Sequence, residues 1–336
     1  MRRIKPFLFV VYVIASLAIL VEGICIYYRY STDTLPTQVE TAASYETANE
    51  KPTSTFTVKA SKQPKNILLI GSDSRGEDGK DYGQRSDSMI LASIQPSNNR
   101  IALVSFMRDM YVSIPDYGMN RLNTAYSFGG VELLEETLMK NFDVGFDNYV
   151  VIDFDGFIKS IASVGGLEIE LTEEEAAYMN KHPEYGWTSE TWDLQPGLNT
   201  LTGEQVLCYS RIRHVGNADW ERTDRQRLVL EKLFQKMKEM PLWKQVPVAN
   251  ELRKNIETDA SYADLLSLAK SVLSQDGISM ESYRLPLDGT YTIETIDEMS
   301  VLNVDPDANA KYLDDILTGA VLEDEAEMPS ESGSQS

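Results

Sequence analysis

Histidine and cysteine are nearly absent from this chain, which has two of each among 336 residues. The histidines are His182 and His214, and no pair of cysteines has the spacing of zinc ligands, so a zinc site is poorly supported. Catalysis by a Cys-His or Ser-His pair is poorly supported for the same reason. Cys25 lies in an N-terminal hydrophobic segment and Cys208 in an apolar stretch, and neither position indicates a disulfide.

Positive charge is also scarce, because 52 acidic residues outnumber 31 lysines and arginines and leave a net charge of -21. Such a surface repels phosphates of nucleic acids, so we expect no nucleic-acid partner. Part of the acidic excess lies in residues 321–336, which contain few apolar residues, and we predict a disordered acidic tail there. The rest of the chain can bury one sizeable core or two small ones.

The N-terminus combines a short basic end with a long hydrophobic segment. Residues 1–6 include Arg2, Arg3 and Lys5, and residues 7–28 are almost uncharged. A helix over 7–28 spans roughly 33 Å, enough to cross a bilayer core, and the basic end is expected to stay in the cytoplasm. A cleaved signal peptide or a lipoprotein signal ending at Cys25 are the alternatives. Residues 31–64 are rich in Thr, Ser, Glu, Lys and Pro and predict a flexible linker.

Residues 65–320 alternate strand-like and helix-like patterns without an interrupting linker, which predicts a single α/β domain with a mixed central sheet flanked by helices. Three capping boxes, which pair Thr172 with Glu175, Thr202 with Gln205 and Thr223 with Gln226, predict helix starts. The strands are expected at 66–71, 87–94, 101–106, 149–154, 167–171 and 282–287, and the other helices at 131–142, 156–164, 262–273 and 308–317.

Arginines are concentrated at 211–227, in a segment without lysine. A planar guanidinium matches phosphate or carboxylate oxygens better than an ammonium does, so the cluster indicates an anion site. Arg222 and Arg225 flank the predicted cap Thr223, at a helix N-terminus that favours anions. Arg211 and Arg213 point to the same side if that segment is extended. The alternative is a surface network of ion pairs with neighbouring acidic residues, and Arg227 is the best candidate for a structural role.

Two aspartates accompany arginines at the ends of predicted strands. Asp73 and Arg75 follow the strand at 66–71, and Arg85 and Asp87 lie at the start of the next one. The edge of a sheet in an α/β fold collects ligands. Asp73 and Asp87 are therefore candidate Mg²⁺ ligands, because Mg²⁺ typically takes one or two carboxylates and completes its shell with water and phosphate oxygens. An aspartate at such a position is otherwise a common turn or cap residue.

Six motifs, read in order, resemble the LytR-CpsA-Psr family. They are GSDSR at 71–75, RSDSM at 85–89, RDMYVSIP at 108–115, RLNTAYSFGG at 121–130, DNYVVIDFDGF at 147–157, and YSRIR with RTDRQR between 209 and 227. Met107 departs from the pattern, since many relatives have proline there. The resemblance implies a membrane-anchored, extracytoplasmic α/β domain of a Gram-positive-type bacterium, with an apolar pocket for a polyprenyl chain.

The resemblance also implies an activity, which is transfer of a glycopolymer, such as teichoic acid or capsular polysaccharide, from an undecaprenyl diphosphate carrier to peptidoglycan. It implies that Asp73 and Asp87 bind Mg²⁺. The residues expected to bind the diphosphate are Arg75, Arg85, Arg108, Arg121, Arg211, Arg213 and Gln226. Of the whole set, Asp73, Arg75, Asp87, Arg108, Arg211 and Arg213 are expected to take part in catalysis. The residues alone do not decide which aspartate acts as a base and which binds metal.

Two rival functions remain open from the sequence. A non-catalytic module that binds polyprenyl diphosphate and regulates wall assembly would keep the arginines and could dispense with Asp73 and Asp87. A lipid diphosphate hydrolase would differ from the transferase only in using water as the acceptor. In all three cases the expected partners include membrane lipid and a polyprenyl diphosphate.

Overall fold

The computed structural model describes residues 64–72, 86–213, 219–261, 263–265, 268 and 277–320, which belong to one compact unit. The predicted membrane helix, nearly all of the linker, the acidic tail, most of the helix predicted at 262–273, and Asp73, Arg75 and Arg85 lie outside the described residues. Within the described part of the chain, no helix is both long and apolar enough to cross a membrane.

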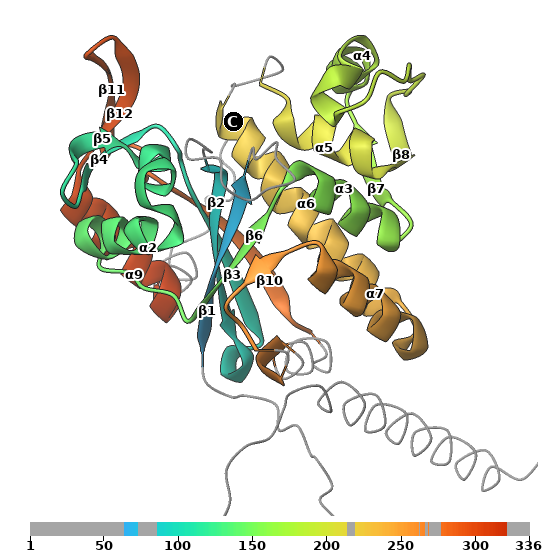
Figure 1. Cartoon of the computed structure of the whole chain (residues 1–336), viewed down its shortest axis with the longest axis horizontal. Coiled ribbons are helices and arrows are strands. Elements are labelled where there is room, and N and C mark those ends of the chain that lie inside the picture. The colour runs from blue at the N-terminus through green and yellow to red at the C-terminus, as the bar shows by residue number, and fades with distance from the viewer. Residues whose placement is uncertain are drawn as a thin grey trace, which may run out of the picture. The chain divides into compact units, whose positions relative to one another are not determined.

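The centre of the fold is a mixed six-stranded sheet in the order β10-β3-β2-β1-β6-β9 (Figure 1). Strands β1 (Lys65–Ser72), β2 (Ser86–Gln95) and β3 (Arg100–Phe106) are antiparallel neighbours. Strand β6 (Asn148–Ile152) runs parallel to β1, and β10 (Ser279–Leu285) runs parallel to β3. The short β9 (Glu257–Thr258) completes the β6 edge. The sheet strands predicted from apolar runs are thus confirmed, with shifts of a few residues at their ends.

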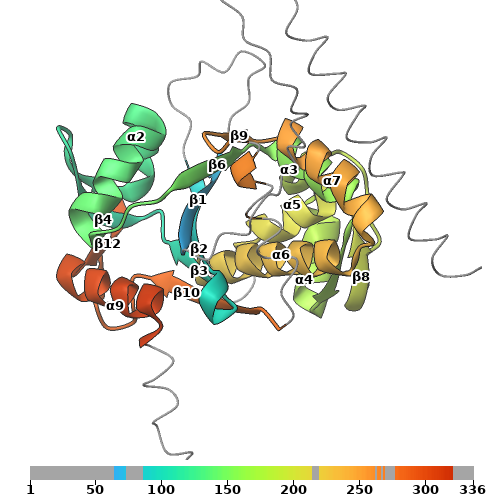
Figure 2. The same ribbon diagram turned by 90° about the horizontal axis from the view of Figure 1, so that it is seen from below.

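Both faces of this sheet are apolar, and each is covered by helices (Figure 2). Leu68, Ile70 and Met89 belong to one buried cluster, whereas the alternate residues Ile67 and Ile90 belong to another. This follows from the period of two in a strand, which sends successive side chains to opposite faces. The prediction of a mixed sheet flanked by helices is confirmed.

One face is covered by helices α2 (Leu122–Phe142) and α9 (Pro306–Thr318). Beside them lies a four-stranded sheet of β11 (Tyr291–Ile296), β12 (Met299–Val304), β4 (Met110–Ile114) and β5 (Gly118–Arg121). Helix α2 begins nine residues before the predicted start at Val131. Gly129 and Gly130 leave helical geometry, with a φ of 65° at Gly130, so the sequence pattern indicates only the part after this break.

The other face is covered by α6 (Asp219–Glu239), α3 (Phe154–Ser163), α5 (Gly203–Arg211) and α7 (Leu242–Lys254). The chain between α3 and α5 adds α4 (Glu173–Lys181) and the hairpin of β7 (Leu167–Leu171) and β8 (Gly197–Leu201). The short 3-10 turns are Pro96–Asn98 and Pro183–Gly186. The capping boxes at Thr172 and Thr202 are confirmed, with both reciprocal hydrogen bonds formed in each.

Two local predictions in the arginine segment are wrong. Thr223 does not cap a helix, because α6 already begins at Asp219 and the Thr223 hydroxyl donates to the carbonyl of Trp220 within the helix. A threonine can form this back-bond inside a helix, so its spacing from Gln226 is not decisive. The segment that ends at Arg211 is also not extended, since α5 runs through Arg211, and Ile212 and Arg213 are the described residues between α5 and α6.

Candidate functional site

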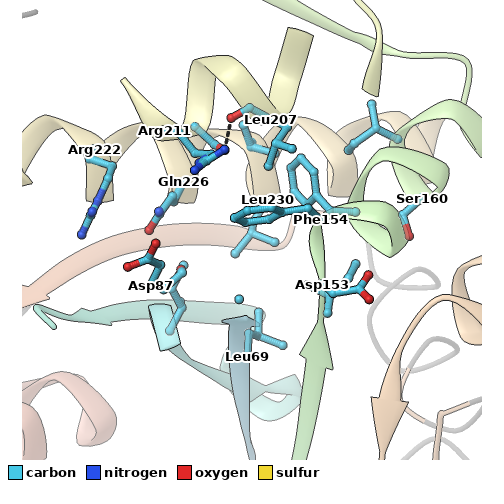
Figure 3. Close-up of a pocket in the computed structure, with 18 of the residues that line it drawn as sticks. Leu69, Asp87, Asp153, Phe154, Ser160, Leu207, Arg211, Arg222, Gln226 and Leu230 are labelled. Carbon is cyan, nitrogen blue, oxygen red and sulfur yellow. Dashed lines mark hydrogen bonds between the residues drawn. The ribbon is translucent and has the colours of Figure 1, made fainter. Parts of the chain in front are cut away.

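A cavity of about 460 Å³ lies between the sheet and helices α3, α5 and α6 (Figure 3). Most of its wall is apolar, and side chains from strands and helices contribute, including Leu69, Ile90, Phe157, Leu207, Leu230 and Leu233. Arg222 and Leu233 both line it from α6, and at 1.5 Å per residue they are about 16 Å apart along the helix. The cavity therefore has the length and polarity to hold an extended apolar chain.

Polar residues gather at one end of the central sheet, where strands β1, β3 and β6 end and β2 begins. Strands β1 and β6 are parallel and both end there, β2 starts there, and β3 ends there because it is antiparallel to β2. Asp87 at the start of β2 and Arg108 just after β3 are consequently brought together. Asp153 follows β6 and also lines the cavity, but its Oδ1 accepts a hydrogen bond from the amide of Gly156 and caps α3.

Asp87 is the carboxylate of this edge. Its Oδ1 accepts a hydrogen bond from Nη1 of Arg108 at 2.7 Å and lies 3.9 Å from Nη2 of Arg213. Burial by itself raises the pKa of Asp87, but the nearby charges of Arg108, Arg222 and Arg213 and the hydrogen bond from Arg108 outweigh burial. The net result is a pKa below the ordinary value of 3.8. Asp87 is thus held ionised among arginines.

Arg108 is linked to Arg121 through a carboxylate that the sequence motifs did not single out. Asp109 accepts from Nε of Arg108 at 3.3 Å through Oδ2, and its Oδ1 lies 3.6 Å from Nε of Arg121. Nη2 of Arg121 donates to the carbonyl of Ser300 at 2.8 Å. Arg121 is therefore connected to the site through Asp109, and it does not line the cavity itself. Asp109 directly follows Arg108 in the motif at 108–115, and this adjacency is the sequence feature that could have indicated the role.

Arg211 projects from the end of α5 into the cavity and is fixed in place by aromatic residues. Its Nη1 donates to the carbonyl of Tyr185 at 2.9 Å, drawn as the dashed line in Figure 3. Its guanidinium lies 4.5 Å from the ring centroid of Phe154 and 5.6 Å from that of Tyr185. Burial lowers the pKa of Arg211, and the charge of Asp87 opposes this. An aromatic support of this kind suits a planar guanidinium.

The arginines of α6 have three different environments. Arg222 and Gln226 are one helical turn apart and both face the cavity opposite Asp87 (Figure 3). Arg225 is buried and pairs with Glu175 and Glu221 instead. Arg227 pairs with Asp224 on the other side of the helix. The structure thus joins Asp87, Arg108, Arg211, Arg213, Arg222 and Gln226 into one site, and the surface-network alternative holds only for part of the segment.

Comparison with known proteins identifies the family of this chain. Residues 31–315 match the LytR_cpsA_psr family. TagU of Enterococcus faecalis, a polyisoprenyl-teichoic acid–peptidoglycan teichoic acid transferase, is 30% identical over 279 residues, which cover 82% of this chain and 85% of TagU. This chain belongs to the LytR_cpsA_psr family. The resemblance drawn from the six motifs is confirmed.

Other relatives extend the comparison within the LytR_cpsA_psr family. The regulatory protein MsrR of Staphylococcus aureus is 29% identical over 255 residues, or 75% of this chain and 73% of MsrR. A structure of the family protein YwtF (TagT) with bound octaprenyl pyrophosphate lipid aligns with a TM-score of 0.59 and 22% identity, covering 80% of this chain and 93% of the other. This last likeness shows that the fold is shared.

The candidate metal site is only partly within the described residues. Asp87 is described and Asp73 is not, and no cluster of three acidic, histidine or cysteine side chains suited to a metal occurs in the described ranges. The ion pairs that Asp87 forms with the described residues Arg108 and Arg213 both use the single oxygen Oδ1. An ionised carboxylate facing a cavity, with its second oxygen outside those pairs, fits the one or two carboxylates that Mg²⁺ usually takes from a protein.

Proposed function

We propose that this protein transfers a glycopolymer, such as teichoic acid or a capsular or secondary wall polysaccharide, from an undecaprenyl diphosphate carrier to peptidoglycan and forms a phosphodiester. One observation carries the proposal. An apolar cavity opens onto Arg211, Arg213, Arg222 and Gln226, which is the polarity of a lipid whose hydrocarbon chain ends in a diphosphate. Guanidinium groups bind phosphate oxygens with strong, charge-assisted hydrogen bonds, and the apolar wall buries the chain.

Two relatives support this substrate class. TagU carries out a teichoic acid transfer to peptidoglycan according to its name, and the TagT structure contains a polyprenyl pyrophosphate. MsrR is named a regulatory protein, and a change in wall assembly is a route by which a transferase can have regulatory effects. The predicted N-terminal helix would hold the domain outside the cytoplasm, next to the leaflet that contains the carrier lipid.

The reaction needs positioning and charge stabilisation more than a covalent nucleophile. A sugar hydroxyl of peptidoglycan attacks the phosphorus attached to the glycan, the new O–P bond forms, and the bond to the bridging oxygen breaks. Undecaprenyl phosphate leaves with the bond electrons, and the hydroxyl proton passes to a base or to solvent. Arg211, Arg213 and Arg222 would hold the diphosphate oxygens and stabilise the charge that grows on the leaving phosphate.

Asp87 is better suited to positioning than to accepting the proton. Its pKa is below the ordinary value, and an effective general base has a pKa near the working pH. Asp87 would instead orient Arg108 and Arg213 and, together with Asp73, hold Mg²⁺. When bound, Mg²⁺ would neutralise part of the diphosphate charge. We therefore assign Asp73 and Asp87 to the metal, and the arginines with Gln226 to the diphosphate.

A reconstituted reaction tests the proposal. The full chain in detergent is mixed with a lipid diphosphate-linked glycan, purified peptidoglycan and Mg²⁺, and the same mixture is made with the Arg211→Gln variant. We expect polymer attached to peptidoglycan by a phosphodiester in the first mixture only. Release of free polymer would indicate a hydrolase, and tight lipid binding without either product would indicate a non-catalytic binding module. Either of these results contradicts the proposed transfer.

A further inference from the structure

A second pair of arginines lies on the β10 side of α6. Gln226 faces the cavity, whereas its neighbour Arg227 lies two helical turns after Trp220, the α6 residue that Arg284 of β10 contacts, and therefore on the same side of α6 as Trp220. Burial lowers the pKa of Arg227, the charge of Asp224 opposes this, and the charge of Arg284 lowers the pKa further, which agrees with this placement. Arg284 is also stacked on Trp220 of α6, with its Cζ 4.1 Å from the ring centroid.

Several polar atoms of this group are buried without a hydrogen-bond partner among the described residues. They are Nε and Nη1 of Arg227, Nε of Arg284 and Oγ of Ser105. Arg227 is 5% exposed, and Ser105 is the direct partner of Arg284 in the parallel pairing of β3 with β10. Buried donors are nearly always satisfied in folded proteins, so three unsatisfied guanidinium nitrogens on two arginines indicate a missing acceptor.

The two carboxylates of the group do not supply that acceptor. Asp224 accepts from Nη2 of Arg227, and Asp288 accepts from Nη2 of Arg284 at 2.9 Å, so each is bound to a nitrogen other than the unsatisfied ones. Their side chains are 56% and 78% exposed, and water screens such ion pairs strongly. The buried side of both guanidinium groups is therefore still cationic.

The group lies at the same sheet edge as the cavity. The amide of Met107 donates to the carbonyl of Leu285 at 3.0 Å, so Arg284 near the end of β10 and Arg108 just after β3 lie at adjacent strand ends. We propose that Arg227, Arg284 and Ser105 form a second oxyanion subsite, separate from the cavity, that binds a phosphate group. The source of this phosphate rests on the proposed function: it would belong to the glycopolymer where it extends past α6 from the diphosphate.

Phosphate binding is tested on the full chain in detergent. The cavity is first saturated with geranylgeranyl diphosphate, and inorganic phosphate is then titrated at constant ionic strength while the midpoint of thermal unfolding is measured. A ligand that binds only the folded state raises this midpoint. We expect a saturable rise for the wild-type protein and at least about tenfold weaker phosphate binding for Arg284→Gln, because a charge-assisted donor is lost. Arg253→Gln, which changes an exposed arginine of α7, should match wild type.

A second variant should change phosphate binding in the opposite direction. It alters the exposed side chain of Asp288, so the fold does not have to tolerate a substitution at a buried position. The negative charge of Asp288 opposes the binding of an anion beside Arg284, so Asp288→Asn should strengthen phosphate binding several-fold. If Arg227 and Arg284 have only a structural role, phosphate should not change the midpoint of thermal unfolding. The proposal is overturned if the wild-type midpoint does not respond to phosphate, if Arg284→Gln leaves the response intact, or if acetate gives the same response as phosphate.

The transfer assay separates this subsite from the proposed function. With a donor whose glycan contains phosphate, Arg284→Gln should raise the KM for the donor at least about fivefold with little change in kcat, because uniform binding is lost. With a phosphate-free glycan donor the same variant should behave as wild type. Saturable phosphate binding without any transfer would support the subsite and contradict the transferase, and equal KM effects on both donors would contradict the assignment to the polymer.

Discussion

Arg225 of α6 donates a hydrogen bond from Nε to Oε1 of Glu175 on α4 at 2.8 Å, and both side chains are more than nine-tenths buried. Glu175 uses its other oxygen, Oε2, to accept from the amide of Thr172 and close the capping box of α4. The same carboxylate therefore caps the N-terminus of α4 and pairs with an arginine of α6. This explains why one arginine of the segment 211–227 is unavailable to a ligand.

Removal of the Glu175 carboxylate should be strongly destabilising. Glu175→Ala takes a buried acceptor away from Arg225 and leaves it paired with the more exposed Glu221, and a broken buried pair typically costs about 3–5 kcal/mol. We expect a loss of that size in the free energy of unfolding, measured by urea denaturation. Glu174→Ala, at the exposed neighbouring position, is the control and should change stability by less than about 0.5 kcal/mol. Equal effects of the two variants would show that the pair contributes nothing.

The planar guanidinium of Arg211 should be essential even when its charge is kept. Arg211→Lys removes the hydrogen bond to Tyr185 and the stacking on Phe154, so the cation is no longer aimed at the diphosphate. We expect kcat to fall by about 100-fold or more, as for other losses of a transition-state donor.

Arg108→Lys should have a comparable effect, because Arg108 bridges Asp87 and Asp109. Steady-state kinetics of both lysine variants, with Arg253→Lys as the control, provide the measurement. Full turnover in both would refute the role given to the arginines.

The depressed pKa of Asp87 predicts a particular dependence of stability on pH. Because the folded pKa lies below the unfolded one, the stabilising contribution is complete above pH of about 5 and is lost as the pH falls through the folded pKa, below about 3.8. The difference in unfolding free energy between wild type and Asp87→Asn should therefore be constant near neutral pH and change only in acid.

Denaturation of both proteins between pH 3 and 7 measures this difference. Arg108→Gln is the informative companion, since it removes the largest of the charges that lower the pKa and should shift the acid transition upward. A difference that already changes between pH 5 and 7 is incompatible with the geometry of the site.

Much of the sheet and part of the site could be predicted from the sequence. The apolar runs that end at Gly71 or follow Asp87 mark strands, because buried strands contain few polar residues. The polar residues of a ligand site collect at the ends of such strands. The strand register then brings Asp87 and Arg108 together, 21 positions apart. Local patterns carry this information, so it is visible without coordinates.

The remaining features depend on contacts between distant segments. Arg225 and Arg222 have the same local context, and only the position of Glu175, 50 residues away, makes one structural and leaves the other at the cavity. Tyr185 and Phe154 support Arg211 through a carbonyl and a ring, neither of which has a sequence signal. The apolar lining of the cavity is likewise indistinguishable from core residues in sequence, because both are simply hydrophobic.

The cavity wall predicts that isoprenoid length matters to binding. Leu233 lines the cavity about 16 Å along α6 from Arg222, so a tryptophan there should obstruct the far end and leave the arginines untouched. Overpacking costs about 1–3 kcal/mol, and Leu233→Trp should therefore weaken binding of a long-chain polyprenyl diphosphate by about tenfold or more.

The control for this prediction is Leu198→Trp, which adds the same bulk at a side chain that is 71% exposed and outside the cavity. Binding of geranyl diphosphate, whose chain is too short to reach Leu233, should be the same in both variants and in wild type. Calorimetric titration with the short and the long diphosphate separates the two contributions, because each methylene buried in the cavity adds up to about 0.8 kcal/mol. If Leu233→Trp weakens the short and the long ligand equally, the chain does not lie along α6, and the apolar wall must have another purpose.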